Sequence, residues 1–200
     1  MRCVPRLSAF MCLALFCATP AYSTQYLFET WTVSGGVPIA PGMDGPSEPT
    51  ASLGTGYGTA LYDDVTHFIT LNARFSGLSG NTTASHIHAP TASPFTGTVG
   101  VATQQPSFPG FPLGVTNGTF TNSYDLSQSS SFNPSYNGGV NQEAAFVAAL
   151  LANKAYWNIH SSTFGGGEIR GFMRLIPEPA SGGLIALGIV GLAGIARRRR

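Results

Sequence analysis

The sequence predicts an all-β protein, built as an antiparallel β-sandwich with one short helix. Only 10% of the 200 residues are charged, and the chain contains 25 Gly and 14 Pro. This composition is typical of all-β proteins outside the cytoplasm rather than of helical cytosolic ones. Short segments of alternating apolar and polar residues recur between clusters of Gly, Pro, Asn and Asp, and only one segment has the pattern of a good helix.

The alternation places the first strands. Residues 26–35 and 52–64 are each predicted to form a strand, and residues 84–90 and 97–102 are predicted as shorter strands. In residues 67–78, every second side chain is apolar, as expected for a strand with one face on the core. The predicted inward residues of that strand are Ile69, Leu71, Ala73 and Phe75.

A long segment, residues 103–142, is rich in Pro, Ser, Asn and Gly and is predicted to be a loop. Loops of this length are usually functional or flexible. Its aromatic side chains are expected to fold back over the sandwich, and stacking on sugar rings is the alternative. They are Phe108, Phe111, Phe132 and Tyr136.

The predicted helix covers residues 141–153. Asn141 suits the N-cap, Glu143 suits the positive first turn, and Asn153 can end the helix in the left-handed region. Residues 155–176 then predict a hairpin, because "SSTFGGG" between two apolar strands contains three glycines that permit a tight return.

The part of the chain between the two termini is mildly acidic. From residue 24 to residue 176 there are four basic and eight acidic side chains, a net charge of −4. This excludes nucleic acid as an expected partner, because phosphate neutralisation needs clustered Lys and Arg. The cysteines all lie near the N-terminus, so this part offers no disulfide and no thiolate metal site. They are Cys3, Cys12 and Cys17.

Residues 1–23 have the pattern of a signal peptide. Arg2 and Arg6 precede an apolar stretch over residues 7–18, and Ala21 and Ser23 are small residues at the positions −3 and −1 for cleavage after Ser23. An uncleaved anchor is the alternative, although the apolar stretch is short for a membrane span.

The last residues have the pattern of a short transmembrane segment. Residues 180–196 carry no charge and would extend about 25 Å as a helix, the short limit for a span. Four terminal arginines would hold its end in the cytoplasm, so the preceding domain would lie outside. A buried helix is the alternative, and it is disfavoured by five glycines in the segment.

These C-terminal residues resemble the PEP-CTERM sorting signal of Gram-negative bacteria. The motif residues are Pro177, Glu178 and Pro179, followed by the apolar segment and by Arg197, Arg198, Arg199 and Arg200. The resemblance implies an exported precursor, anchored transiently in the membrane and recognised by an exosortase. It also implies release to the cell surface or into an extracellular polysaccharide matrix.

Two histidines on one predicted strand form a candidate metal site. His86 and His88 lie at positions i and i+2, so both point away from Ile87, and Asn158 and His160 point away from the core on a later strand. Three imidazoles with an open fourth position would suit zinc or copper. The alternative is a hydrogen-bonded structural cluster, and no cofactor is certain.

The hairpin adds Glu168 and Arg170 to the same predicted face. Glu168 is expected opposite His160 across the ladder, where it could orient a ligand imidazole. In the alternative, Glu168 and Arg170 pair with neighbouring groups. We expect the three histidines, Glu168 and Arg170 to form one surface cluster.

The same segments resemble the CHRD domain, over roughly residues 26–175, which places the domain at residues 24–176. The resemblance implies an immunoglobulin-like sandwich without an established enzymatic activity. The long insert at residues 103–142 and the segment at residues 33–50 depart from the family pattern. The signature positions are His86, His88, His160, Gly167, Glu168, Ile169, Arg170 and Gly171.

The expected function is therefore that of a secreted, non-enzymatic structural or binding module, with extracellular polysaccharide as a candidate partner. The alternative is a metal-binding protein or metalloenzyme, by analogy with the copper site on the sandwich of Cu,Zn superoxide dismutases. A two-metal site of that type needs more imidazoles than four histidines provide. The fourth, His67, is expected on the Ile69 face, away from solvent or at an edge.

Overall fold

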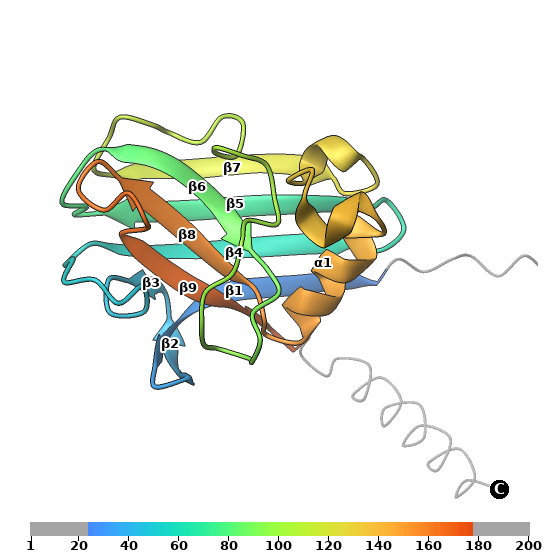
Figure 1. Cartoon of the computed structure of the whole chain (residues 1–200), viewed down its shortest axis with the longest axis horizontal. Helices are drawn as coiled ribbons and strands as arrows, with labels where there is room; N and C mark the ends of the chain where they lie inside the picture. Colours follow the sequence, from blue (N-terminus) through green and yellow to red (C-terminus); the bar gives the residue numbers. More distant parts are fainter. Residues whose placement is uncertain (1–23, 178–200) are drawn as a thin grey trace, which may run out of the picture.

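The computed structural model describes residues 24–177 and shows strands folded over one another, with one helix at the end of the stack (Figure 1). The predicted signal peptide, the predicted transmembrane segment and the terminal arginines lie outside these residues. Within residues 24–177, no helix has the length and apolar character needed to cross a membrane.

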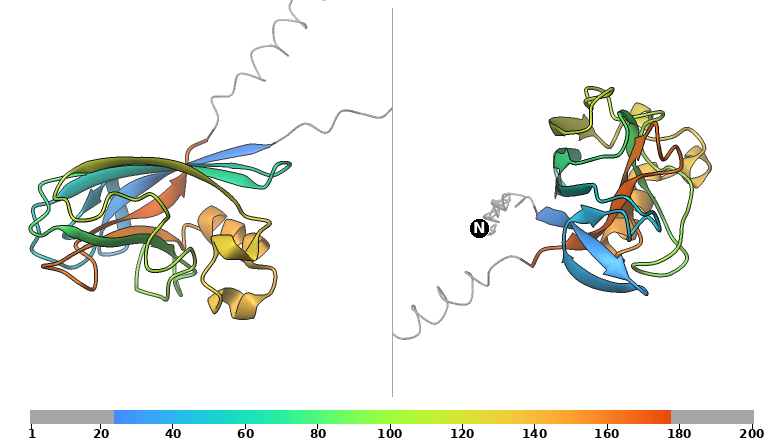
Figure 2. Two further views of the ribbon diagram at one scale, coloured as in Figure 1. Left: turned by 90° about the horizontal axis from the view of Figure 1, so that it is seen from above. Right: turned by 90° about the vertical axis from the view of Figure 1, so that its left-hand side faces the viewer.

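The strands form two layers that cross at an angle, as the two views of Figure 2 show from above and from the side. The rear layer of Figure 1 consists of β1 (Gln25–Ser34), β4 (Thr55–Asp63), β5 (Phe68–Ser76) and β7 (Gly118–Asp125), paired antiparallel in that order. The front layer consists of β6 (Thr82–His88), β8 (Tyr156–Ser161) and β9 (Ile169–Leu175).

One edge of the sandwich is closed by hydrogen bonds that run from layer to layer. Strand β1 pairs with β9 as well as β4, and the short strand β3 (Met43–Asp44) also pairs with both. Strand β2 (Val37–Pro41) extends the end of β1. The nine strands of the described residues therefore form one antiparallel sheet that folds over on itself.

The predicted all-β class is confirmed, as are the hairpin and the strands around residues 26–35, 52–64, 67–78 and 84–90. The prediction of a strand at residues 97–102 was wrong, because within this segment only Val101 pairs with another strand, in an isolated bridge with His88. Strands β2, β3 and β7 were not predicted. In β7 the alternation is weak because only Phe120 is fully buried, with Gly, Asn and Ser around it.

The core lies between the two layers. The four predicted inward residues of β5 are all buried, which confirms the alternation. Trp157 from β8 fits against Gly58 of β4, where an added Cβ would lie 2.8 Å from the indole ring. The indole Nε1 donates to Ser85 Oγ (2.8 Å), which also ties β8 to β6.

The aromatic residues of the long insert complete this core, as predicted. Phe108 stacks on Phe120 and meets Trp157 edge to face, and Phe132 and Tyr136 pack edge to face on Phe146 of the helix. All four predicted aromatics are buried, so the alternative that they stack on sugar rings was wrong.

Helix α1 (Gln142–Leu151) follows two 3-10 turns, Ser129–Ser131 and Tyr136–Gly139. Asn153 has a φ of 56°, as predicted for the residue that ends the helix. Asn141 is the N-cap residue, as predicted, but it has a φ of 48° and its side chain makes no capping bond. Glu143 instead accepts from the Tyr62 hydroxyl (2.7 Å) and contacts His67 Nδ1 (2.8 Å).

We predict that Gly171→Ala strongly destabilises the fold. A Cβ at this position of β9 would overlap the backbone oxygen of Gly42 and lie 2.7 Å from Thr30 Cβ, neither of which is a flexible side-chain end. Overpacking of this kind lowers the free energy of unfolding by about 1–3 kcal/mol. Urea unfolding measures it, with Gly166→Ala as control, because nothing lies within 4 Å of a Cβ there. Equal stability of the two variants would contradict the predicted packing.

Candidate metal centre

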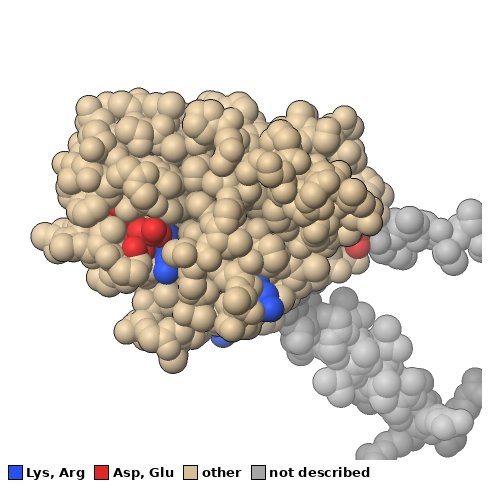
Figure 3. All heavy atoms as spheres, in the orientation of Figure 1, with Lys and Arg blue, Asp and Glu red and all other residues tan. Residues whose placement is uncertain are grey.

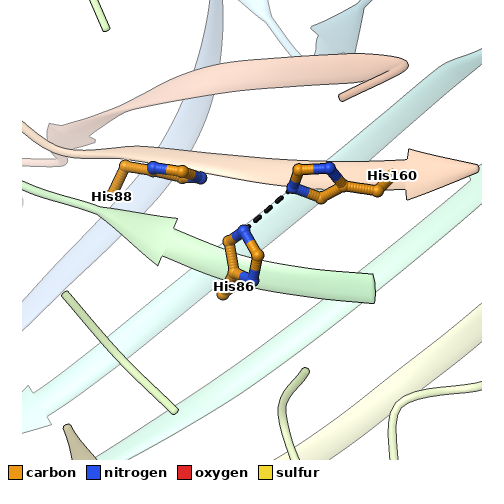
Figure 4. Close-up of side chains that lie close together, drawn as sticks. All are labelled: His86, His88 and His160. Atoms are coloured by element: carbon orange, nitrogen blue, oxygen red, sulfur yellow. Dashed lines mark hydrogen bonds between the residues drawn. The ribbon is translucent and has the colours of Figure 1, made fainter. Parts of the chain in front are cut away.

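The pairing of β6 with β8 brings three histidines together. His86 and His88 of β6 lie on the face opposite the buried Ile87, and His160 of β8 is registered with Ala84, two residues before His86. Their rings point toward one another above the two strands (Figure 4). One ring nitrogen from each of the three lies within 4.8 Å of the others.

The cluster is buried, whereas the sequence predicted a surface cluster. The exposed fractions of His86, His88 and His160 are 6%, 9% and 9%. The chain between β6 and β7 covers them, since carbonyl oxygens of Val99 and Pro106 contact the rings. The side chains do point away from the core, but this loop adds a third layer. The surface over this face carries few charged side chains (Figure 3).

Each imidazole is held by a backbone carbonyl at Nδ1. The acceptors are Pro106 O for His86 (3.1 Å), Val99 O for His88 (2.6 Å) and Gly165 O for His160 (2.9 Å). A carbonyl oxygen only accepts, so the tautomer that satisfies all three contacts carries its hydrogen on Nδ1. In that tautomer every Nε2 has a free lone pair.

The three Nε2 atoms then face one another, and no N–H or O–H group of residues 24–177 donates a hydrogen bond to them. His86 Nε2 and His160 Nε2 lie 2.9 Å apart. Two lone pairs at this distance repel unless a proton or a cation lies between them. His88 Nε2 is buried without a hydrogen-bond partner. The site thus has three oriented acceptor nitrogens, and a positively charged group between them would stabilise their lone pairs.

All three imidazoles are neutral at physiological pH. Burial lowers the pKa of His86 to about 3, with further lowering from His88 and His160, and burial lowers the pKa of His88 to about 4. Burial also lowers the pKa of His160. Neutral imidazole is the form that binds metal ions, so no proton has to leave before a metal binds.

The side chains beside the histidines form a buried stack. The Tyr156 ring lies parallel to His88, with ring centroids 4.6 Å apart, and the Arg170 guanidinium lies over the other side of Tyr156 at 4.7 Å. Arg170 Nε pairs with Glu48 Oε2 (3.4 Å). Burial raises the pKa of Glu48 to about 7, against the lowering effects of Arg170 and Asn158. Asn158 is registered between His86 and Arg170.

Glu168 has another role than the one predicted. Its Oε1 accepts from Ser52 Oγ (2.6 Å) and from the Ser79 backbone N–H (2.5 Å), and backbone carbonyls orient the imidazoles instead. Burial alone would raise the pKa of Glu168, but hydrogen bonds from Ser161, Ser52 and Ser79 lower it. Glu168 therefore fastens the β9 end of the hairpin to two loops.

His67 also departs from expectation. It lies in the turn before β5 with a φ of 62°, and its side chain is 46% exposed beside Glu143. None of the contacts that His67 makes within residues 24–177 involves a histidine of the cluster. Tyr156 could have been found from the sequence, because it lies four residues before His160 on the same face of the strand. Glu48 carries no such signal, since it lies in a loop.

Comparison with known protein families agrees with this arrangement. A model of the CHRD domain matches residues 39–173, which contain all three histidines and the hairpin. The chain belongs to the CHRD-domain family. A model of the PEP-CTERM protein-sorting motif matches residues 175–200. Neither the curated proteins nor the solved structures gave a match.

The two family matches define the cellular setting of the CHRD domain. The sorting motif indicates an exported precursor that is anchored in the membrane of a Gram-negative bacterium and processed by an exosortase. The protein is thus a secreted and sorted surface protein, and its CHRD domain is the part that the structure describes.

We predict that the metal-free protein loses stability steeply as the pH falls from about 6.5. The folded-state pKa values of the three histidines lie below the unfolded value of about 6.5, so the unfolded chain binds more protons in this window. The raised folded-state pKa of Glu48 has the opposite effect on stability, and it offsets the contribution of about one histidine. Each proton by which the unfolded chain exceeds the folded chain corresponds to about 1.4 kcal/mol per pH unit.

Urea unfolding between pH 5 and 7.5 with a chelator present measures this dependence. His86→Gln removes one of the titrating imidazoles, so its stability should fall less steeply with decreasing pH. A wild-type curve that is flat over this window would contradict buried neutral imidazoles.

Proposed function

We propose that this protein is an exported metal-binding module, in which His86, His88 and His160 hold a zinc or copper ion. The observation that supports it is the buried convergence of three Nε2 lone pairs whose rings are each locked through Nδ1. Fixing the far nitrogen by a hydrogen bond is how metal-binding imidazoles are usually oriented.

The spacing of the nitrogens fits an ion after a small adjustment. Zinc–nitrogen bonds of about 2.0–2.1 Å place tetrahedral neighbours about 3.4 Å apart. The His86–His160 contact at 2.9 Å is slightly shorter, and the largest separation in the cluster is below 4.8 Å. An ion would push the first pair apart and draw His88 in, through ring rotations about the side-chain torsions.

The ligand chemistry selects the class of metal. The site offers imidazole nitrogen only, which suits zinc, copper, nickel and iron, and copper(II) binds most tightly in the general order of divalent ions. Magnesium and calcium prefer oxygen ligands and would not compete. The bound ion supplies positive charge to the three lone pairs.

The role we propose for this ion is structural, within a non-enzymatic surface module. Each ligand residue is over 90% buried, and the 89–117 loop contacts His86 and His88, so the ion would hold this loop against β6 and β8. A three-nitrogen site also leaves a fourth position, which keeps a one-metal enzyme as the alternative. The fourth histidine of the chain does not complete a two-metal site, since it contacts Glu143.

We predict that the full-length chain, stripped and reloaded, binds one equivalent of Zn²⁺ or Cu²⁺. Replacing His86, His88 or His160 by Ala should weaken binding by more than about 100-fold, because each supplies one of three ligands. Titration calorimetry with metal analysis of the dialysed protein measures both quantities. His67→Ala is the matched control and should bind as the wild type does.

Two further readouts separate metal binding from a structural histidine cluster. Saturating metal should raise the melting temperature of the wild type and of His67→Ala, but not that of the other three variants. The proposal fails if the wild type binds no metal, or if His67→Ala loses as much affinity as the cluster variants.

A further inference from the structure

The outer side of the folded sheet carries a second constellation, around the edge where β9 pairs with β1 and along the outer face of the rear layer. One row of registered residues crosses five strands there, in the order β9, β1, β4, β5 and β7. Its members are Arg174, Glu29, Thr59, Asn72 and Thr121. The neighbouring row contains Tyr57, Arg74 and Thr119. We call this surface the arginine face.

On this face, an arginine guanidinium group stacks over each of two aromatic rings. The Arg74 guanidinium lies 4.9 Å from the centre of the Tyr57 ring, and the Arg174 guanidinium lies 4.4 Å from that of Trp31. Glu29 fixes both rings, because it accepts from the Tyr57 hydroxyl (2.8 Å) and from Trp31 Nε1 (2.9 Å). The carboxylate is thereby engaged with the rings rather than with the guanidinium groups.

These two arginines are the exposed cations of the described domain. Of the other basic residues in residues 24–177, Arg170 is buried in its pair with Glu48, and Lys154 is half-buried. Neither Arg74 nor Arg174 forms an ion pair with a carboxylate of the described residues. Residues 24–176, with a net charge of −4, thus expose two guanidinium groups that no carboxylate neutralises.

A groove of about 730 Å³ opens beside Arg74 on this face. Its walls contain Tyr57, Pro41 and several neutral hydrogen-bonding side chains, and no carboxylate. Next to it, Thr121 donates to Asn72 (2.9 Å) and Thr70 pairs with Ser123 (2.8 Å), which continues the polar surface along β5 and β7. The neutral polar residues of the groove are Thr55, Ser76, Asn117 and Thr119.

We propose that the arginine face binds an acidic polysaccharide outside the cell, with Arg74 and Arg174 each pairing with a sugar carboxylate. A guanidinium group donates two parallel hydrogen bonds to a carboxylate, and its stacking on an aromatic ring keeps it pre-oriented. The neutral hydroxyl and amide groups beside Arg74 match the hydroxyl groups of sugar rings. Nucleic acid is disfavoured, because two cations neutralise too few phosphates for appreciable affinity.

The spacing of the two arginines selects a polymer. They lie three strand steps apart, about 14 Å along the sheet. A single sugar cannot reach both, so a chain of several sugar units is needed. The export of the protein, shown by its sorting motif, brings this face to the place where such polymers occur.

The test is affinity electrophoresis and titration of the full chain against polygalacturonate, with carboxyl-reduced polygalacturonate as the neutral polymer. We expect retention by the acidic polymer alone. Arg74→Gln and Arg174→Gln should each weaken it by about tenfold, the loss of one charge-assisted contact. Arg200→Gln removes the same charge outside the described domain and should bind as the wild type does.

Three results would overturn the proposal. They are equal retention by the neutral polymer, equal losses in Arg200→Gln and in the Arg74 and Arg174 variants, and competition by monomeric galacturonate as effective as that by the polymer. Melting curves check that the variants are folded, and glutamine keeps a polar side chain at each position. Retention should be the same with chelator and with added metal, so this result is independent of the three-histidine site.

Discussion

The register between β6 and β8 is the constraint on which the histidine cluster depends. Side chains of a strand alternate between its faces, so a slip of one residue would bury His86 and His88 in the core and expose Ile87. Trp157 prevents this slip. Its ring fills the space above Gly58, and its Nε1 donates to Ser85 Oγ, which in turn donates to Asn158 O (3.1 Å). A core packing interaction thus positions the polar residues on the opposite face.

The loop between β6 and β7 has two roles that a single geometry satisfies. Strand β6 is at the end of its layer, and an uncovered edge invites pairing with other chains. The loop covers this edge through Phe108 N to Ser85 O (2.9 Å) and Gly114 N to Thr82 O (2.8 Å). The same crossing aims the carbonyls of Val99 and Pro106 at the imidazoles. Edge protection and ring orientation therefore come from one segment, although it has little regular structure.

Local patterns were enough to predict the strands with strong alternation, the hairpin and the common face of His86 and His88. They could not predict burial of that face, because the covering loop has no periodicity and its position depends on long-range contacts. Glu168 shows the same limit. Its register opposite His160 was predictable, but Gly167 has a φ of 130°, and the Glu168 carboxylate reaches Ser52 and Ser79 instead. The strand β7 escaped notice because it buries one large side chain among polar residues.

The three arginines of residues 24–177 differ in how their charge is neutralised. Arg170 is buried, and it is tolerated there because Glu48, Ser47 O and Gly97 O surround its guanidinium. A dication at the nearby histidines would still experience repulsion from this charge, so neutral imidazoles must supply all of the binding energy locally. On the arginine face, the Glu29 carboxylate accepts hydrogen bonds from the Tyr57 hydroxyl and Trp31 Nε1, so it does not pair with the guanidinium groups of Arg74 and Arg174. Arg170 is thus paired with a carboxylate, whereas Arg74 and Arg174 are left unpaired, and the placement of two carboxylates, Glu48 and Glu29, makes the difference.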